Sequence, residues 1–309
     1  MSNSRFFLGV DGGGTKTEFV CMNESGQVVA RTVTGTTYHL QVGCEEAVER
    51  IRVGVGGICA ELAITPAAFA YAFFGLPAFG EDAMIDPLLD QACGRILGHD
   101  RYRCGNDMVC GWAGSLACED GINLVAGTGS IGYGERQGRS ARIGGWGEMF
   151  SDEGSAYWIA IRGLNAFTRM SDGRLPAGPL LGGFRQTLGL TNDLDLCAMI
   201  MGDQGMARDD VAGLAKIVSQ AAEAGDIAAC LILDDAGREL ATMARSLRDI
   251  LGFPADEATP LSWSGGVLTG QKLVSDALAR HLGEGFVLIE PRHPPGNGAA
   301  LYARLLGGR

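Results

Sequence analysis

Short apolar runs separated by turn residues dominate the first 35 positions of the chain. Phe6–Val10 is apolar, Glu18–Met22 follows a run of three glycines, and Gln27–Thr34 is rich in β-branched residues. The tetrapeptide NESG at 23–26 is typical of a tight turn between two strands. This pattern predicts three antiparallel strands that follow one another directly.

Helical spacing of apolar residues first occurs at Cys44–Leu62, although three glycines in this segment weaken the pattern. Strand-like and helix-like segments then alternate up to about residue 118, which is typical of α/β folds. The predicted elements are a strand at Ala70–Gly75, a helix at Asp82–Leu97, a strand at Tyr102–Asn106 and a helix at Met108–Cys118.

The second half of the chain opens as the first half does. The apolar run Ile122–Ala126 precedes the turn GTGS, and the strand-like segments IGYGER and RSARIGG follow. Helices then predominate, with two further strands between them. The predicted elements are helices at Glu153–Met170, Met206–Ala224, Asp226–Leu251, Gln271–Leu282 and Gly298–Leu306, and strands at Leu261–Ser264 and Gly285–Ile289.

Two halves with the same opening predict an α/β protein of two related domains, with a ligand cleft between them. We place the boundary near residues 114–120, which gives domains of residues 1–117 and 118–309. The terminal helix, at about residues 298–309, is a candidate to pack back on the first domain.

Composition narrows the class of protein. The formal charge of −11 argues against nucleic-acid binding, which needs a basic surface. The chain contains neither an apolar run of the roughly 20 residues that span a bilayer nor a signal-peptide pattern at its start, so we expect no membrane partner and a cytoplasmic location. Nine cysteines without a C-x-x-C pair, and four scattered histidines, argue against zinc or a disulfide scaffold.

The first glycine turn raises the question of ligand chemistry. Gly12–Gly14 lie between two predicted strands, whereas a dinucleotide-binding turn or a phosphate-binding P-loop leads into a helix. A hairpin turn of this kind can expose amides to an anion, and Asp11 before it can orient water molecules around Mg²⁺. The alternative is a turn with only a structural role.

Two further glycine turns bear on the choice between a ligand-binding and a purely structural role. Gly127–Ser130 could hold a second part of a phosphate chain, and Gly265–Gly266 could approach a nucleoside closely because no side chain intervenes. Three independent structural turns remain the alternative. Together the three turns favour a nucleotide that lies across the predicted cleft.

These motifs carry a resemblance to known families. DGGGTKT at 11–17, the strand-end Asp107, AGTGS at 126–130 and SGGV at 264–267 together resemble the sugar kinase/Hsp70/actin superfamily. The segment GGWGEMFSDEGSAYWIA at 144–160 resembles, more narrowly, the N-acetylglucosamine kinase and BadF/BadG-type ATPase family. The resemblance implies two actin-like (ribonuclease H-like) domains and the ATP- and Mg²⁺-dependent phosphorylation of an amino sugar, with N-acetylglucosamine 6-phosphate as the first candidate product.

The resemblance also implies residue roles. Asp107 would be the general base and would contact the sugar, and Asp11 would hold Mg²⁺ through water. The remaining implied contacts are Gly12, Gly13, Gly14, Thr15, Lys16, Gly127, Thr128, Gly129 and Ser130 with the phosphates, Gly265 and Gly266 with the adenosine, and Tyr38, Gly145, Trp146 and Asp152 with the sugar.

Simpler roles compete with three of these assignments. Asp107 stands where a helix N-cap belongs, and capping amides would help to keep its carboxylate charged. Asp152 and Glu153 would begin a helix, where acidic residues are favoured by the helix dipole alone. Lys16 could be a solvated lysine of a turn.

One departure from the family pattern leaves the sugar open. Animal-type N-acetylglucosamine kinases carry a Ser-Thr-Asn-His-Trp stretch, and TTYHL at 36–40 stands in its place, with Tyr38 for the asparagine and Leu40 for the tryptophan. A kinase for glucosamine or another hexose is therefore an alternative. A BadF-type ATPase activator would need cysteines for an iron–sulfur cluster between subunits, and a sugar-responsive regulator would need a DNA-binding module. A homodimer is left open.

Overall fold

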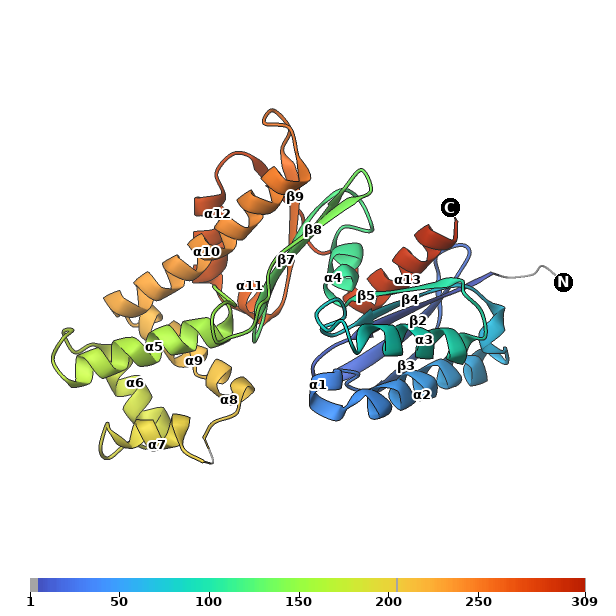
Figure 1. Ribbon diagram of the computed structural model, residues 1–309. Coiled ribbons are helices and arrows are strands. Elements are labelled where there is room, and N and C mark those ends of the chain that lie inside the picture. Colours follow the sequence, from blue (N-terminus) through green and yellow to red (C-terminus); the bar gives the residue numbers. More distant parts are fainter. Residues whose placement is uncertain (1–4, 204, 309) are drawn as a thin grey trace. The chain divides into compact units, whose positions relative to one another are not determined.

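Ten strands form two five-stranded sheets in residues 5–203 and 205–308, which the computed structural model describes (Figure 1). Each sheet belongs to its own compact unit. Unit 1 comprises Met1–Asp120 and Ile289–Arg309, and unit 2 comprises Gly121–Leu288. The predicted α/β class is confirmed.

The sheet of unit 1 has the order β3-β2-β1-β4-β5. β1 pairs antiparallel with β2, and β2 with β3, whereas β1, β4 and β5 run parallel. The parallel pairs require helical crossovers, and the antiparallel strands need only tight turns. The strands are β1 Phe6–Gly12, β2 Lys16–Asn23, β3 Val28–Gly35, β4 Phe69–Leu76 and β5 Tyr102–Asn106.

Helices cover both faces of this sheet (Figure 1). Phe19 and Val20 of β2 point to opposite faces, so Phe19 packs against Gly54 of α2 and Val20 packs near Ala300 of α13. α13 also approaches β1 so closely that a side chain at Gly9 would collide with the backbone of Ala300. The helices are α1 His39–Val42, α2 Cys44–Leu62, the 3₁₀ turn η1 Pro66–Ala68, α3 Asp86–Leu97, α4 Met108–Ser115 and α13 Pro295–Gly307.

The sheet of unit 2 repeats this arrangement, with the order β8-β7-β6-β9-β10. β6 pairs antiparallel with β7, and β7 with β8, whereas β6, β9 and β10 run parallel. The strands are β6 Gly121–Ala126, β7 Ser130–Arg136, β8 Arg139–Gly144, β9 Thr259–Ser264 and β10 Phe286–Leu288.

Helices make up most of unit 2. The long α10 packs against β6, β7 and β8 and against α12, and the segment between β8 and α10 forms a helical layer of its own (Figure 1). Buried Leu, Ile, Val, Ala and Phe side chains of these helices and of the sheet form one core. The helices are α5 Ala156–Ser171, α6 Pro179–Leu188, α7 Asp195–Met201, α8 Arg208–Gly213, α9 Ala215–Glu223, α10 Ile227–Leu251, α11 Gly266–Gly270 and α12 Lys272–Leu282.

Several predicted boundaries were wrong for local reasons. The helix predicted to begin at Glu153 begins at Ala156, because the Ser155 hydroxyl caps the Trp158 amide at 3.1 Å. The helix predicted at Met206–Ala224 is two helices, α8 and α9, which meet next to Gly213. The helix predicted at Met108–Cys118 ends at Ser115, and Ala117 and Cys118 adopt positive φ. Four helices, α1, α6, α7 and α11, were not predicted.

None of the helices in the described parts of the chain has both the length and the apolarity of a membrane span.

Candidate active site

Two aspartates mark the carboxyl ends of parallel strands in unit 1. Asp11 lies at the end of β1 and pairs in register with Gly75 of β4, which in turn pairs with Gly105 of β5. Asp107 follows the last residue of β5. The carboxyl ends of parallel strands share one edge of the sheet, so Asp11 and Asp107 lie at the same edge, with β4 between their strands.

The surroundings of Asp11 make its carboxylate unusually basic. Burial and the nearby negative charge of Asp107 raise the pKa of Asp11 to about 7, although a hydrogen bond with the Cys110 thiol acts in the opposite direction. Cys110 is fully buried, and its Sγ also lies 3.6 Å from the Val10 carbonyl oxygen. Gly75 leaves the space for this sulfur, because a Cβ there would collide with it.

Asp107 occupies the N-cap position of α4 but does not act as the cap. Its side chain makes no hydrogen bond to the first turn of the helix, and the Oδ1 of Asn106 accepts from the Met108 amide at 3.1 Å instead. The prediction that capping amides help to keep Asp107 charged is therefore wrong. Asn106, and not Asp107, thus caps the first turn of α4.

The first glycine turn is a hairpin held at its base. The Gly13 amide donates to the Lys16 carbonyl at 2.8 Å, and the Thr36 hydroxyl donates to the Gly13 carbonyl at 2.7 Å. Gly12 is packed so closely that a Cβ would lie 2.7 Å from the Thr37 hydroxyl. Gly14, Thr15 and Lys16 are exposed.

This first turn does not have the αR-αL form of an anion-binding nest. That form requires a residue with positive φ, and Gly12, Gly13 and Gly14 all have negative or extended φ. Gly12 is needed here for close packing, and Gly14 is open to solvent. Binding of an anion by the amides of this turn stays a prediction, as do the contacts of Thr15 and Lys16 with a phosphate.

Tyr38 and His39 lie beyond β3, at the beginning of α1. Tyr38 is half-buried at the N-cap position, and its ring stands edge-on to the ring of His39. His39 is only 6% exposed, yet neither of its ring nitrogens has a hydrogen-bond partner among the described residues. Buried polar groups without partners are rare in proteins.

The second glycine turn is built into the start of α5. The Gly127 amide donates to the Gly129 carbonyl at 2.9 Å, which closes the turn. The amides of Ala156 and Tyr157 donate to the carbonyls of Gly127 and Thr128, at 2.9 and 3.2 Å. The first turn of α5 is thus satisfied by the glycine turn, and the two form one rigid piece of unit 2.

Asp152 lies behind this turn and pairs with an arginine. Its side chain is 3% exposed, its backbone has φ of 62°, and Oδ2 accepts from Nη2 of Arg208 at 2.7 Å. Burial raises the pKa of Asp152, whereas Arg208 and the Ser130 amide lower it. Asp152 lies outside α5, so the prediction that it begins this helix is wrong.

Gly145 and Trp146 belong to the loop after β8. Gly145 has φ of 68° and packs so tightly on Ile131 that a Cβ would lie 2.7 Å from its Cδ1. Trp146 is 73% exposed in unit 2. Only glycine fits this position of the loop without strain, and the indole ring of Trp146 is exposed.

The third glycine turn touches the second. Gly265 has φ of 92°, and a Cβ on it would lie 2.9 Å from the Gly127 amide nitrogen. Beside this contact is a pocket of about 490 Å³, whose wall includes Gly127, Thr128 and Gly266. Residues predicted for the phosphates and for the adenosine are therefore brought together in unit 2.

A family model matches almost all of the chain, over residues 8–303. The chain belongs to the BadF/BadG/BcrA/BcrD ATPase family. The resemblance stated from the motifs is thus confirmed.

Named relatives align with nearly the whole chain. N-acetyl-D-glucosamine kinase of Dictyostelium discoideum is 26% identical over 316 residues, which cover 97% of this chain and 98% of the relative. N-acetylmuramic acid/N-acetylglucosamine kinase of Clostridium acetobutylicum is 28% identical with the same coverage. The solved structure of a candidate N-acetylglucosamine kinase from Chromobacterium violaceum is 23% identical, covers 99% of both chains and has a TM-score of 0.68, so it supports the fold.

Sequence reasoning missed part of the pocket of this family member. α8 and α9 contribute a wall that includes Asp209, Lys216 and Ser219, and Gln271 adds another polar group. None of these residues belongs to a glycine motif. The available signal was the polar face of the helix predicted at 206–224, which periodicity alone could not distinguish from a solvated surface.

The cysteines do not form a cluster site. Among the described residues, no group of three or more His, Cys, Asp and Glu side chains could hold a metal ion. All nine cysteines are free, and those that are exposed, Cys197 and Cys230, lie in different helices of unit 2. This distribution gives no support to the iron–sulfur alternative.

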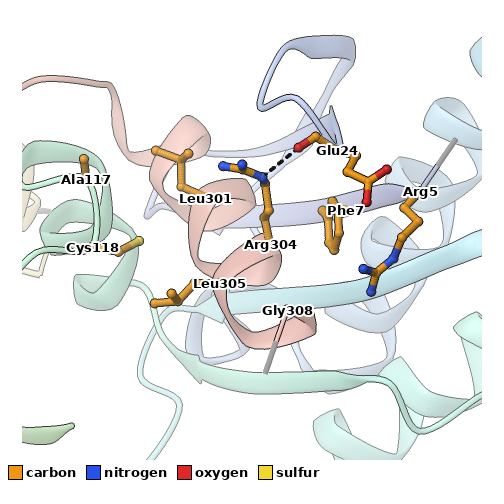
Figure 2. Close-up of a pocket in the computed structure, with 9 residues that line it drawn as sticks. All are labelled: Arg5, Phe7, Glu24, Ala117, Cys118, Leu301, Arg304, Leu305 and Gly308. Carbon is orange, nitrogen blue, oxygen red and sulfur yellow. Dashed lines mark hydrogen bonds between the residues drawn. The ribbon is translucent and has the colours of Figure 1, made fainter.

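A second hollow, of about 470 Å³, lies on unit 1 away from the strand-end aspartates (Figure 2). Arg5, Phe7 and Leu301 line it, and Arg304 in its wall donates to the Glu24 carbonyl at 3.1 Å. It contains none of the predicted site residues.

Proposed function

We propose that this protein is an ATP-dependent amino-sugar kinase, with N-acetylglucosamine as the first candidate substrate and its 6-phosphate as the product. The observation that carries the proposal is the alignment of two named amino-sugar kinases over 97% of the chain. The strand-end aspartates and the paired glycine turns support it, because each is a group that phosphoryl transfer requires.

The nucleotide is assigned to unit 2. The pocket of about 490 Å³ has the size of a small-ligand site, and glycine backbone forms one wall. We assign the adenosine to this pocket, beside Gly265 and Gly266, and the phosphates to the turn at Gly127–Ser130. Thr15 and Lys16 of unit 1 are assigned to the terminal phosphate.

The residues around Asp11 suit a magnesium ion. A carboxylate that burial and Asp107 render basic gains stability from a nearby cation. Since the described residues contain no complete protein ligand set, Asp11 would hold Mg²⁺ together with water and the phosphates, as is usual for this ion. When bound, the ion would neutralise charge that develops on the phosphates.

Asp107 is assigned as the general base. An ionised carboxylate within reach of the sugar hydroxyl can accept its proton while the hydroxyl oxygen attacks the terminal phosphorus of ATP. The bond from that phosphorus to the bridging oxygen breaks, and ADP leaves. Because Asn106 caps α4, Asp107 can perform this role without loosening the helix.

The sugar is assigned to Asp152, Gly145 and Trp146 of unit 2 and to Tyr38 of unit 1. A buried carboxylate and an exposed indole ring are suitable partners for hydroxyls and for the apolar face of a sugar. His39, next to Tyr38, adds ring nitrogens that a ligand could satisfy. We further propose a cytoplasmic location, in keeping with nine free cysteines.

The test is a coupled assay of ADP release with Mg-ATP and a panel of sugars. The panel contains N-acetylglucosamine, N-acetylmuramic acid, N-acetylmannosamine, glucosamine and glucose. Turnover that depends on an amino sugar supports the proposal, and the preferred sugar shows what Tyr38 and Leu40 select. ADP release without sugar dependence would favour the ATPase-activator alternative, and preference for glucose would favour a hexose kinase.

A further inference from the structure

Adjacent residues at the start of α8 belong to two different parts of unit 2. The guanidinium of Arg208 reaches Asp152 Oδ2 at 2.7 Å and Glu148 Oε2 at 3.0 Å. Asp209 instead lines the pocket assigned to the adenosine, together with Ala212 and Gly213 of the same helix. α8 therefore connects the pocket with the carboxylate assigned to the sugar.

The second glycine turn also contacts the ion pair of Arg208 and Asp152. A Cβ on Gly129 would lie 2.7 Å from both Arg208 Nη2 and Asp152 Oδ2, so the ion pair packs directly on the turn. The loop after β8 is joined to the same point through Glu148. One guanidinium thus links α8, the sugar-side loop and the turn assigned to the phosphates.

Asp152 depends on such a partner. Its φ of 62° lies in the left-handed region, which non-glycine residues adopt at an energetic cost. Its carboxylate is also almost completely buried, and an unpaired buried charge is strongly unfavourable. Arg208, which is 41% exposed, can leave this pair at a lower desolvation cost than Asp152.

The order of α8 depends on its contacts, because the helix is short. A helix of six residues is marginal on its own, so its order depends on packing against its neighbours. A nucleotide in the pocket would add contacts to Ala212 and Gly213 and would hold α8 in place. A ligand that binds one arrangement better than another shifts the population towards it.

We propose that Arg208 is a positioning residue that couples nucleotide binding to sugar binding. The proposal rests on the proposed kinase function. The nucleotide orders α8, and Arg208 then holds Asp152 in the arrangement that binds the sugar. Since coupling between two binding sites is reciprocal, the sugar must strengthen nucleotide binding by the same factor.

The experiment measures dissociation constants by isothermal titration calorimetry on the full chain. N-acetylglucosamine is titrated with and without saturating Mg-ADP, in the wild type, Arg208→Met and Arg208→Lys. We expect ADP to strengthen sugar binding at least about fivefold in the wild type. The ratio should fall below about twofold in Arg208→Met and should recover in part in Arg208→Lys.

Arg185→Met is the matched control, because it removes a 2.7 Å ion pair with Asp193 elsewhere in unit 2. It should keep the wild-type ratio. A wild-type ratio in Arg208→Met, even with weaker affinities, would overturn the proposal, as would a ratio of one in the wild type. If Arg208→Met does not fold, Arg208→Gln takes its place in the same comparison. If the wild type binds neither ADP nor sugar, the proposed function itself fails.

Discussion

The two sheets share one topology but differ in the chemistry at the ends of their strands. The order β3-β2-β1-β4-β5 in unit 1 corresponds strand by strand to β8-β7-β6-β9-β10 in unit 2. In unit 1 the ends of the first and last parallel strands lead to Asp11 and Asp107. In unit 2 the first parallel strand ends at Ala126, and the second leads to Gly265. The strand ends compared in unit 1 thus lead to carboxylates, and those in unit 2 lead to glycine turns; we call the first the charged edge and the second the neutral edge.

The glycine turns differ in the same way. The turn of unit 1 ends in exposed residues around Lys16 and is fixed only at its base. The turn of unit 2 accepts two hydrogen bonds from α5 and packs against the Asp152–Arg208 pair. A repeated strand–turn–strand unit can therefore present charge in one copy and rigid backbone in the other, so topology alone does not assign a role.

The largest expected effect concerns the charged edge. Asp107→Asn should reduce turnover at least about 10³-fold, because it removes the group that accepts the proton. Asp107 makes no side-chain bond to the first turn of α4, and the asparagine removes its repulsion of Asp11, so the melting temperature should not fall and sugar binding should remain measurable. Steady-state kinetics, calorimetric sugar binding and thermal unfolding measure the three quantities. Turnover within tenfold of the wild type would remove the assignment of the base.

Asp11→Asn, at the same edge, should lower the activity and raise the stability of the protein. We expect turnover to fall about 10²-fold, because charge stabilisation near the phosphates is lost. The free energy of unfolding of the ligand-free protein should rise by about 1–3 kcal/mol at pH 8, because a buried, repelled carboxylate is removed.

The pH dependence of the free energy of unfolding tests the direction of this effect. The pKa of Asp11 is about 7 in the folded protein, above the ordinary value of 3.8, so the folded state binds more protons between these values. Wild-type stability should therefore fall as pH rises through this interval, and the gain in Asp11→Asn should be smaller at pH 5 than at pH 8. Denaturant titrations at both values measure it, and an equal gain at both would contradict the explanation.

Periodicity was sufficient to predict most elements and the glycine turns, but not the contacts between distant segments. Cys44–Leu62 and Tyr102–Asn106 were predicted with the observed bounds, the first of them although three glycines weaken its helical pattern. The partner of Asp152 could not be predicted, since Arg208 lies 56 positions away and no local pattern links them.

Local competition explains another failure. Asn106 and Asp107 are adjacent, and both residue types are good helix caps. The sequence does not show that Asn106 accepts the hydrogen bond of the Met108 amide, because the choice between the two residues depends on how the end of β5 orients their side chains. The sequence could suggest Asp107 as a candidate base, but it could not show which of the two neighbours caps α4.

A smaller effect is expected at the neutral edge, where substitutions of two neighbouring glycines should affect stability differently. Gly265→Ala should lower the free energy of unfolding by about 1–3 kcal/mol, because φ is 92° and a Cβ would collide with Ala126. Gly266→Ala should leave stability within about 0.5 kcal/mol, since a Cβ there meets nothing within 4 Å.

Affinity for the nucleotide distinguishes the two glycines further. Gly266 lines the pocket, so a methyl group there should raise the KM for ATP about tenfold if the adenosine lies against it. Thermal unfolding and ATP kinetics on both variants provide the comparison. An unchanged KM in Gly266→Ala would place the nucleoside elsewhere and would leave the neutral edge without its assigned role.

The smallest expected effect is a shift in the acid limb of sugar binding in Glu148→Gln. Burial raises the pKa of Asp152 and Glu148 raises it further, whereas Arg208 and the Ser130 amide lower it. Removing the negative charge of Glu148 should keep Asp152 ionised to lower pH, so the acid limb should move to lower pH. Calorimetric titrations with N-acetylglucosamine between pH 4 and 8 measure the limb. Movement in the opposite direction would mean that Glu148 acts mainly by holding Arg208 against Asp152. The glycine turn of the neutral edge would then depend on the charged side chains packed behind it.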